Sequence, residues 1–192
     1  KMQNDVEGIK KMFISVSGII ALIIFPFMVL LAVLAEPIVS LIFGAQWLPI
    51  VDTLSILSIV GMFQSVSSLI GILFIVFNKN NLAFRITLVT SIITVVLIVW
   101  SIYTFKSIEI TSLIYGVSSL VLLYPMYYSA GKIMKVSVAQ MLFPIVYPLI
   151  FSLITGFFGW FFYHALPLDS IFIKLLITMP AALGLYLFCC IF

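Results

Sequence analysis

The chain has 192 residues, of which 65% are hydrophobic and 8% are charged. Soluble domains carry about 25% charged residues, so this composition excludes a soluble globular protein and predicts an integral membrane protein. The formal net charge is only +3, and the positive residues are scattered along the chain, which excludes the basic patch that a nucleic-acid partner requires.

Charged residues divide the sequence into long uncharged runs. About 20 apolar residues cross a bilayer, and a charge near the centre of a span costs about 2.5 to 3.5 kcal/mol, so these runs are the natural transmembrane helices. We predict an all-α, polytopic helix bundle with about six transmembrane helices, short loops and no soluble domain. The predicted spans are 12–35, 53–78, 86–105, 110–131, 138–163 and 171–192.

The sequence AEPIVSLIFGAQWLPI, residues 35–50, separates the first two spans. Pro37, Gly44 and Pro49 interrupt regular hydrogen bonding of the backbone, which lipid cannot satisfy. Trp47 prefers the boundary between lipid and water. We therefore expect an elbow that lies half-submerged at the level of the lipid headgroups.

Small and hydroxyl residues recur at helical spacing in the second span, and similar stripes occur in the three spans that follow. In lipid, such residues let helices approach closely and form hydrogen bonds between them. The alternative is that some of them line a hydrated cavity. Gln64 is the best candidate for a cavity residue because it is the largest uncharged polar side chain deep in a span. The stripe beside it contains Ser55, Ser58, Gly61, Ser65 and Ser68.

Positive residues are unequally divided between the two sides of the predicted bundle. One alternate set of loops holds seven Lys and Arg residues and the other set holds two. Cytoplasmic loops are the positive ones in membrane proteins, so we predict that the first set is cytoplasmic, that both chain ends are cytoplasmic, and that the elbow faces outward. The seven are Lys1, Lys10, Lys11, Lys79, Arg85, Lys132 and Lys135, and the other two are Lys106 and Lys174.

Arg85 opens the third span and follows Lys79 in the sequence NKNNLAFR. At this place both side chains are available to a lipid phosphate on the cytoplasmic side. The alternative is that they are only anchors that fix the orientation. With Gln64, these residues are the predicted substrate-binding residues.

The sequence offers no catalytic or metal-binding constellation. The single His164 has no second His or Cys nearby, and no Gly-rich phosphate loop occurs. No two acids share a helix face within a span, so general acid–base catalysis has no obvious pair. The adjacent Cys189 and Cys190 point in different directions on a helix and are expected to be reduced packing residues. We predict that the chain is not an enzyme and binds no metal or cofactor.

Several stretches carry a family resemblance. They are KMQNDVEGIKKMF, FPFMVLLAVLAEPIVSLIFGAQWLPIVDTLSIL and GILFIVFNKNNLAFRITLV, and the elbow supplies Glu36-Pro37, Phe43-Gly44-Ala45-Gln46-Trp47 and Leu48-Pro49-Ile50. They resemble the polysaccharide flippases of the MOP superfamily, which are the Wzx-type exporters of O-antigen, colanic acid and teichuronic acid. The family's GR-x-DL motif is replaced by Asn78-Lys79-Asn80-Asn81-Leu82, which lacks its Gly and acid. The resemblance covers residues 1 to about 95, and beyond them only the pattern of spans agrees.

The resemblance implies a MOP/MATE-like carrier with two lobes of helices around a central cavity. This chain would be a piece of a longer protein and would form part of the C-terminal lobe. The substrate would be an undecaprenyl-diphosphate-linked oligosaccharide, moved from the cytoplasmic to the outer leaflet of the bacterial inner membrane. Implied partners are this lipid-linked oligosaccharide, membrane lipids, the N-terminal lobe of the same chain and the polysaccharide polymerase machinery. The family's cationic cavity residues lie largely in the first lobe, so none is carried over.

Two alternatives stay open. A MATE-like multidrug or ion antiporter shares the fold, although such carriers usually hold a charged residue deep within the membrane. The one charge inside a predicted span, Lys174, lies near its end, where it can reach the interface. The second alternative is a non-transporting membrane scaffold or assembly protein. Upstream spans with buried basic residues would favour the flippase, and a buried Asp or Glu would favour the antiporter.

Overall fold

The computed structural model describes residues 6–191, and the regular elements among these residues are all helical. Lys1, counted above among the positive residues, and Phe192, the end of the last predicted span, lie outside the described residues. Six helical segments are long and apolar enough to cross a membrane. The prediction of an all-α, polytopic membrane protein is therefore confirmed. The membrane limits of the spans stay predictions, since helix bounds do not mark where lipid begins.

The chain forms long helices joined by short helical elbows. In order, the elements are α1 (Val6–Val33), α2 (Ala35–Ile42), the 3-10 helix η2 (Ala45–Ile50), α3 (Val51–Val76), α4 (Asn80–Phe105), α5 (Ile108–Leu122), α6 (Tyr124–Met134), α7 (Val138–Leu142), the 3-10 helix η3 (Phe143–Ile145), α8 (Val146–Ala165) and α9 (Ile171–Ile191).

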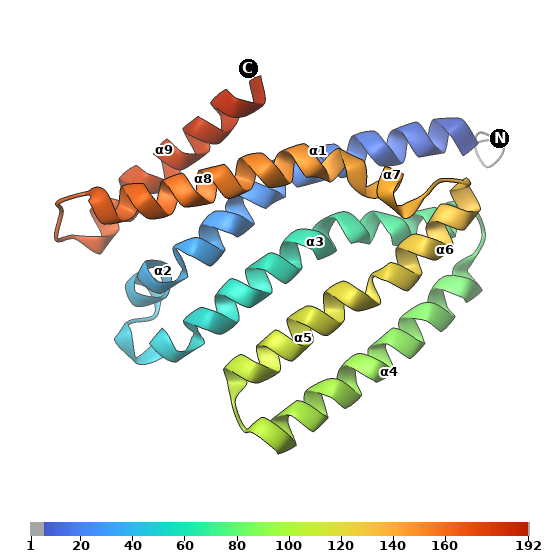
Figure 1. Ribbon diagram of the computed structural model, residues 1–192, viewed down its shortest axis with the longest axis horizontal. Coiled ribbons are helices and arrows are strands. Elements are labelled where there is room, and N and C mark those ends of the chain that lie inside the picture. Colours follow the sequence, from blue (N-terminus) through green and yellow to red (C-terminus); the bar gives the residue numbers. More distant parts are fainter. Residues whose placement is uncertain (1–5, 192) are drawn as a thin grey trace.

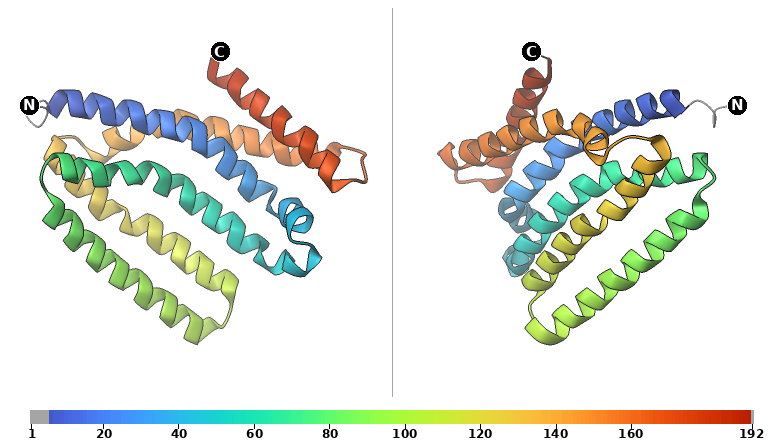
Figure 2. Two further views of the ribbon diagram at one scale, coloured as in Figure 1. Left: turned by 180° about the vertical axis from the view of Figure 1, so that it is seen from behind. Right: turned by 45° about the vertical axis from the view of Figure 1, so that its right-hand side comes forward.

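The long helices lie beside one another in the order α9, α8, α1, α3, α5 and α4 (Figure 1). Helix α1 packs against both α3 and α8, so it joins the first and last parts of the chain. Helix α4 packs mainly against α5 at the edge of this layer, and Figure 2 shows how far it stands from α8 and α9. Most of the α4 side chains are exposed in consequence, and Ser101 is the one that is buried.

The two ends of the bundle differ in charge. The start of α1, the α3–α4 connection and the α6–α7 connection lie at one end, on the right of Figure 1. We call it the basic end, because it carries Lys10, Lys11, Lys79, Arg85, Lys132 and Lys135. The opposite end carries Lys106 and Lys174 together with Glu36, Asp52, Glu109 and Asp169.

The predicted elbow consists of two short helices, α2 and η2, which meet at Gly44. This glycine has φ of 88° and ψ of 169°, a backbone conformation that essentially only glycine adopts. Trp47 follows in η2 with 48% of its surface exposed, and its ring lies 6.2 Å from that of Phe43. Gly44 therefore turns the chain so that these aromatic rings project from the opposite end.

Prolines divide two of the long segments. Pro125 lies in the first turn of α6 and donates no backbone hydrogen bond, so the predicted span 110–131 becomes two helices that meet at Leu123. Pro144 likewise lies in η3, between α7 and α8. By contrast, Pro26 and Pro180 lie inside the continuous helices α1 and α9.

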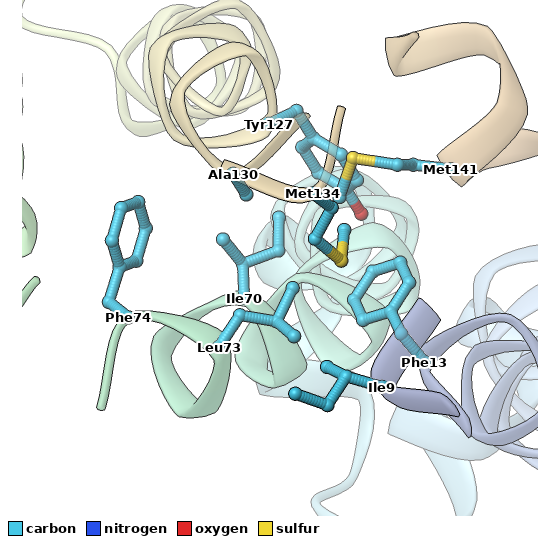
Figure 3. Close-up of a cluster of buried hydrophobic side chains, with 9 residues drawn as sticks. All are labelled: Ile9, Phe13, Ile70, Leu73, Phe74, Tyr127, Ala130, Met134 and Met141. Atoms are coloured by element: carbon cyan, nitrogen blue, oxygen red, sulfur yellow. The ribbon is translucent and has the colours of Figure 1, made fainter. Parts of the chain in front are cut away.

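An apolar cluster holds the basic end together (Figure 3). Helix α1 contributes Ile9 and Phe13, and side chains of α3, α6 and α7 complete it. Farther along, α8 approaches α1 closely at Gly156 and Gly159, where added Cβ atoms would press on Val29 and Leu30. The small residues in the fifth predicted span thus serve helix packing. The remaining members of the cluster are Ile70, Leu73, Phe74, Tyr127, Ala130, Met134 and Met141.

Candidate functional site

Gln64 lies near the middle of α3 with its side chain exposed. Its Nε2 donates to the hydroxyl of Tyr115 on α5 across 3.4 Å, a long and therefore weak hydrogen bond. An amide can make four hydrogen bonds, and within the described part of the chain Tyr115 is its one partner. The amide is therefore largely free to bind something else.

Ser68 lies one turn from Gln64 on the same exposed face of α3. Its hydroxyl donates to the carbonyl of Ser65 at 2.7 Å, and Ser65 donates to the carbonyl of Met62 at 2.7 Å. These hydroxyls are satisfied by their own helix. Gln64 is thus the side chain on this face with the most unused hydrogen-bonding capacity.

Other hydroxyls hold helices together. Ser55 donates to the carbonyl of Ala32 in α1 at 2.9 Å, and the hydroxyl oxygens of Ser112 in α5 and Thr53 in α3 lie 3.1 Å apart, within hydrogen-bond distance. In lipid, small polar residues are expected to form such hydrogen bonds between helices. In the second span Ser55 therefore serves packing, whereas Gln64, beside the stripe, lies on an exposed face and its role in a cavity stays a prediction.

Lys79 and Arg85 lie together at the basic end. They line one surface pocket of about 360 Å³ with Asn78, Asn81 and Leu82. Asn78 has φ of 54°, a left-handed turn that Asn tolerates, and this turn joins α3 to α4. Among the described residues, neither cation has a carboxylate within 4.0 Å. Two unpaired cations with neighbouring amides make this pocket suitable for an anion such as phosphate.

The three predicted residues do not form one site. Gln64 precedes Lys79 by 15 positions, which corresponds to about 22 Å along a helix. The structure thus brings Lys79 and Arg85 together and places Gln64 deep in the membrane-spanning part. The sequence did not reveal that Gln64 meets Tyr115, because this contact joins residues 51 positions apart.

The described residues contain no group of three His, Cys, Asp or Glu side chains that could hold a metal ion. His164 contacts the carbonyl of Trp160 through Nδ1 at 2.8 Å, at the opposite end of the bundle. It shares a pocket of about 270 Å³ with Glu36 and Tyr163. Cys189 and Cys190 are free thiols.

The N-terminal quarter of the chain matches a known family. A family model described as "Polysaccharide biosynthesis protein" matches residues 1–52. An "Uncharacterized membrane protein in cps region" of Klebsiella pneumoniae is 35% identical over 101 residues, which are 53% of this chain and 21% of that protein. The "Lipopolysaccharide biosynthesis protein WzxC" of Escherichia coli (strain K12) is 31% identical over 85 residues, which are 44% of this chain and 17% of that protein.

The aligned regions thus span about a fifth of the length of these curated relatives. No solved structure matches the chain.

Proposed function

Since this multi-pass membrane protein resembles polysaccharide biosynthesis proteins of the flippase type, we propose that it is part of a transporter that moves a lipid-linked oligosaccharide across the bacterial inner membrane. The described helices would form part of the C-terminal lobe. The substrate would be an undecaprenyl-diphosphate-linked repeat unit, passed from the cytoplasmic to the outer leaflet for surface polysaccharide synthesis. In this role the protein is a carrier and not an enzyme, and it works beside the polymerase machinery.

The exposed amide of Gln64 is the observation that carries this proposal. A sugar is too polar to cross hydrocarbon alone, because each unpaired hydroxyl costs several kcal/mol there. Polar side chains deep in a span usually face a bundle interior or a hydrated cavity. An amide with free donors and acceptors at this depth supports a cavity through which hydroxyl groups pass.

The pocket with Lys79 and Arg85 fits the other part of the substrate. A diphosphate is anionic, and guanidinium and ammonium groups form strong, charge-assisted hydrogen bonds with phosphate oxygens. The positive-inside rule places the basic end at the cytoplasm, where the substrate would be loaded. We propose that this pocket receives the diphosphate before the sugar enters the cavity, while the lipid tail stays in the bilayer.

The acidic residues bear on the antiporter alternative. Glu7, Glu36, Asp52 and Glu109 each lie in the first turn of a helix, and Asp169 lies in a loop. Ion-coupled carriers usually use a charged residue buried within the membrane. The part of the chain that the structure describes therefore lends the antiporter no support.

The proposal is tested in cells that lack the gene. We expect undecaprenyl-linked repeat units to accumulate on the cytoplasmic side and the surface polysaccharide to disappear. Lipid extraction and mass spectrometry would measure the accumulated units and identify the sugar. Normal lipids combined with new sensitivity to cationic drugs would reject the flippase and support the antiporter.

A further inference from the structure

Two cavities of different chemistry adjoin where α6 turns into α7. The first is a groove of about 420 Å³ with an almost wholly apolar lining. The second, of about 410 Å³, contains Lys132 and Lys135. Tyr124 and Val138 line both cavities, so the groove and the cationic pocket meet along these two side chains.

The groove suits a hydrocarbon chain. Its polar side-chain groups include Ser67 and Tyr127, whose hydroxyl oxygens lie 3.2 Å apart. Ser67 donates its hydrogen to the carbonyl of Phe63 at 2.8 Å, so Tyr127 is the donor to Ser67. Both hydroxyls are thus satisfied within the protein. The apolar lining comes from Phe63, Leu120, Leu123, Leu142, Ile145, Val146 and Leu149.

The fold holds the two lysines on a tight turn at the basic end. Lys135 ends α6 in a left-handed conformation with φ of 56°, and the N–H of Val136 donates to the carbonyl of Gly131 at 2.9 Å. A Cβ at Gly131 would lie only 2.7 Å from the carbonyl oxygen of Val136, so this turn requires glycine. Ser137 then begins α7 with a capping box. Both ends of the turn are therefore fixed.

The lysine charges are available to an anion. Both side chains are exposed, and among the described residues neither lies within 4.0 Å of a carboxylate. The Nζ of Lys132 lies 4.6 Å from the centre of the Tyr128 ring, which directs the ammonium toward the pocket that both residues line. Two unpaired ammonium groups beside the apolar groove match a ligand that joins a negative group to a hydrocarbon chain.

We propose that this pair of cavities binds one anionic glycerophospholipid of the membrane, with an acyl chain in the groove and the phosphate at Lys132 and Lys135. Basic pockets between transmembrane helices are known to bind anionic headgroups. The site is separate from the proposed transport path: neither cavity is lined by Gln64, Lys79 or Arg85. On α3, Gln64 projects about 100° round the helix from Phe63, which lines the groove. The inference therefore goes beyond the proposed function.

The headgroup contact is tested with the purified full-length protein in detergent. Native mass spectrometry would measure binding of phosphatidylglycerol and of phosphatidylcholine with the same chains. We expect preferential binding of phosphatidylglycerol and an affinity about thirtyfold lower in the double variant Lys132→Gln and Lys135→Gln, because each lysine near a membrane surface contributes about 1 kcal/mol.

The opposite end offers a matched control, the double variant Lys106→Gln and Lys174→Gln. Lys106, like Lys135, ends a helix in a left-handed conformation, with φ of 50°. Lys174, like Lys132, lies over a tyrosine ring, at 5.3 Å from the centre of Tyr163. The control variant should bind phosphatidylglycerol as the natural protein does. An equal loss in both double variants, or equal binding of the two lipids, would overturn the proposal.

The groove is tested by filling it. Val146 lines the groove with 40% of its surface exposed, so Val146→Trp should obstruct the groove and weaken long-chain phosphatidylglycerol at least tenfold. Ile150 lies one turn away on α8 outside the groove, with 47% exposed, and Ile150→Trp is the control that should not change binding. If Val146→Trp fails to fold, the natural protein is tested instead with short-chain phosphatidylglycerol, which should bind much more weakly than the long-chain lipid. Equal affinity for both chain lengths, or a co-purified polyprenyl diphosphate in place of the glycerophospholipid, would reject the assignment.

Discussion

At the scale of the single residue, the polar residues within the spans fall into two groups that differ in their hydrogen-bond partners. Ser55, Thr53 and Ser112 each form a hydrogen bond with a neighbouring helix and so stabilise packing. Gln64 keeps most of its hydrogen-bonding capacity on an exposed face, with one long contact to Tyr115. The sequence left packing and a cavity open for the stripe of small residues, and it selected Gln64, beside that stripe, as the cavity candidate by its size and polarity. It could not assign a role to each serine, because the assignment depends on which helix lies opposite.

Replacing Gln64 tests the proposed cavity. We expect Gln64→Leu to lower polysaccharide export about fivefold, which corresponds to one lost hydrogen bond of about 1 kcal/mol, while the amount of protein in the membrane stays normal. Surface polysaccharide and membrane protein level would both be measured. Ser68→Ala is the control on the same face and should change little, since Ser68 is bound to its own helix. A parallel fall in export and in protein level would mark Gln64 as a packing residue.

Lys79 and Arg85 allow a second test at this scale. The double variant Lys79→Gln and Arg85→Gln should lower the export rate about tenfold at limiting substrate and less at saturating substrate, because it removes both cations from the pocket. The rate would be followed in inverted membrane vesicles loaded with the lipid-linked sugar. Lys10→Gln with Lys11→Gln removes two charges from the same end outside this pocket. An equal effect of both pairs would show that Lys79 and Arg85 are only membrane anchors.

At the scale of the element, each helix is defined by local sequence and positioned by small residues. Prolines and left-handed residues mark several of the places where described helices end, as Pro125 does at the α5–α6 junction and Asn78 does after α3. Close contacts between helices depend instead on glycines, which have no side chain to hold the two backbones apart. At Gly116 a Cβ would lie 2.9 Å from Ile56 and 3.3 Å from Val60, so α5 approaches α3 as closely as it does only with glycine there.

Gly156 provides the sharpest test of these contacts. An added Cβ at this position would collide with Val29, a buried β-branched residue with little freedom to move. We expect Gly156→Ala to destabilise the protein by about 1–3 kcal/mol, the usual cost of overpacking. Thermal unfolding of the purified protein would measure the change. Gly71→Ala is the control, because nothing lies within 4 Å of its added Cβ.

The whole molecule is polarised, with six basic residues at one end and two at the other among those described. The arrangement of the helices brings together basic residues from three separate parts of the chain. These parts are the start of α1, the α3–α4 connection and the α6–α7 connection. The same arrangement produces the apolar groove beside Lys132, which is lined from α3, α5, α6, α7 and α8, whereas residues 78–85 alone line the pocket beside Lys79. Both proposed sites for anions therefore lie at the end that the positive-inside rule assigns to the cytoplasm.

The orientation can be measured with single cysteines. In a background of Cys189→Ala and Cys190→Ala, Ala139→Cys marks the basic end and Gln46→Cys marks the opposite end, and both positions are exposed. We expect a membrane-impermeant maleimide to label Gln46→Cys in intact cells whose outer membrane is permeable, and to label Ala139→Cys only after the inner membrane is opened. The reverse pattern would contradict the predicted orientation and the proposed loading side.

The sequence by itself determined the membrane class, the helical content and the division of charges, because hydrocarbon permits only helices or closed barrels and excludes unpaired charges. These constraints act on each segment separately, so uncharged runs suffice to reveal them. The elbow was predicted in the same way, from Gly44 and its neighbouring prolines. Only the tertiary structure decided that Gln64 meets Tyr115 and that an apolar groove adjoins Lys132. Those contacts join helices whose order in space follows from close approach at small residues, which the sequence of one helix does not specify.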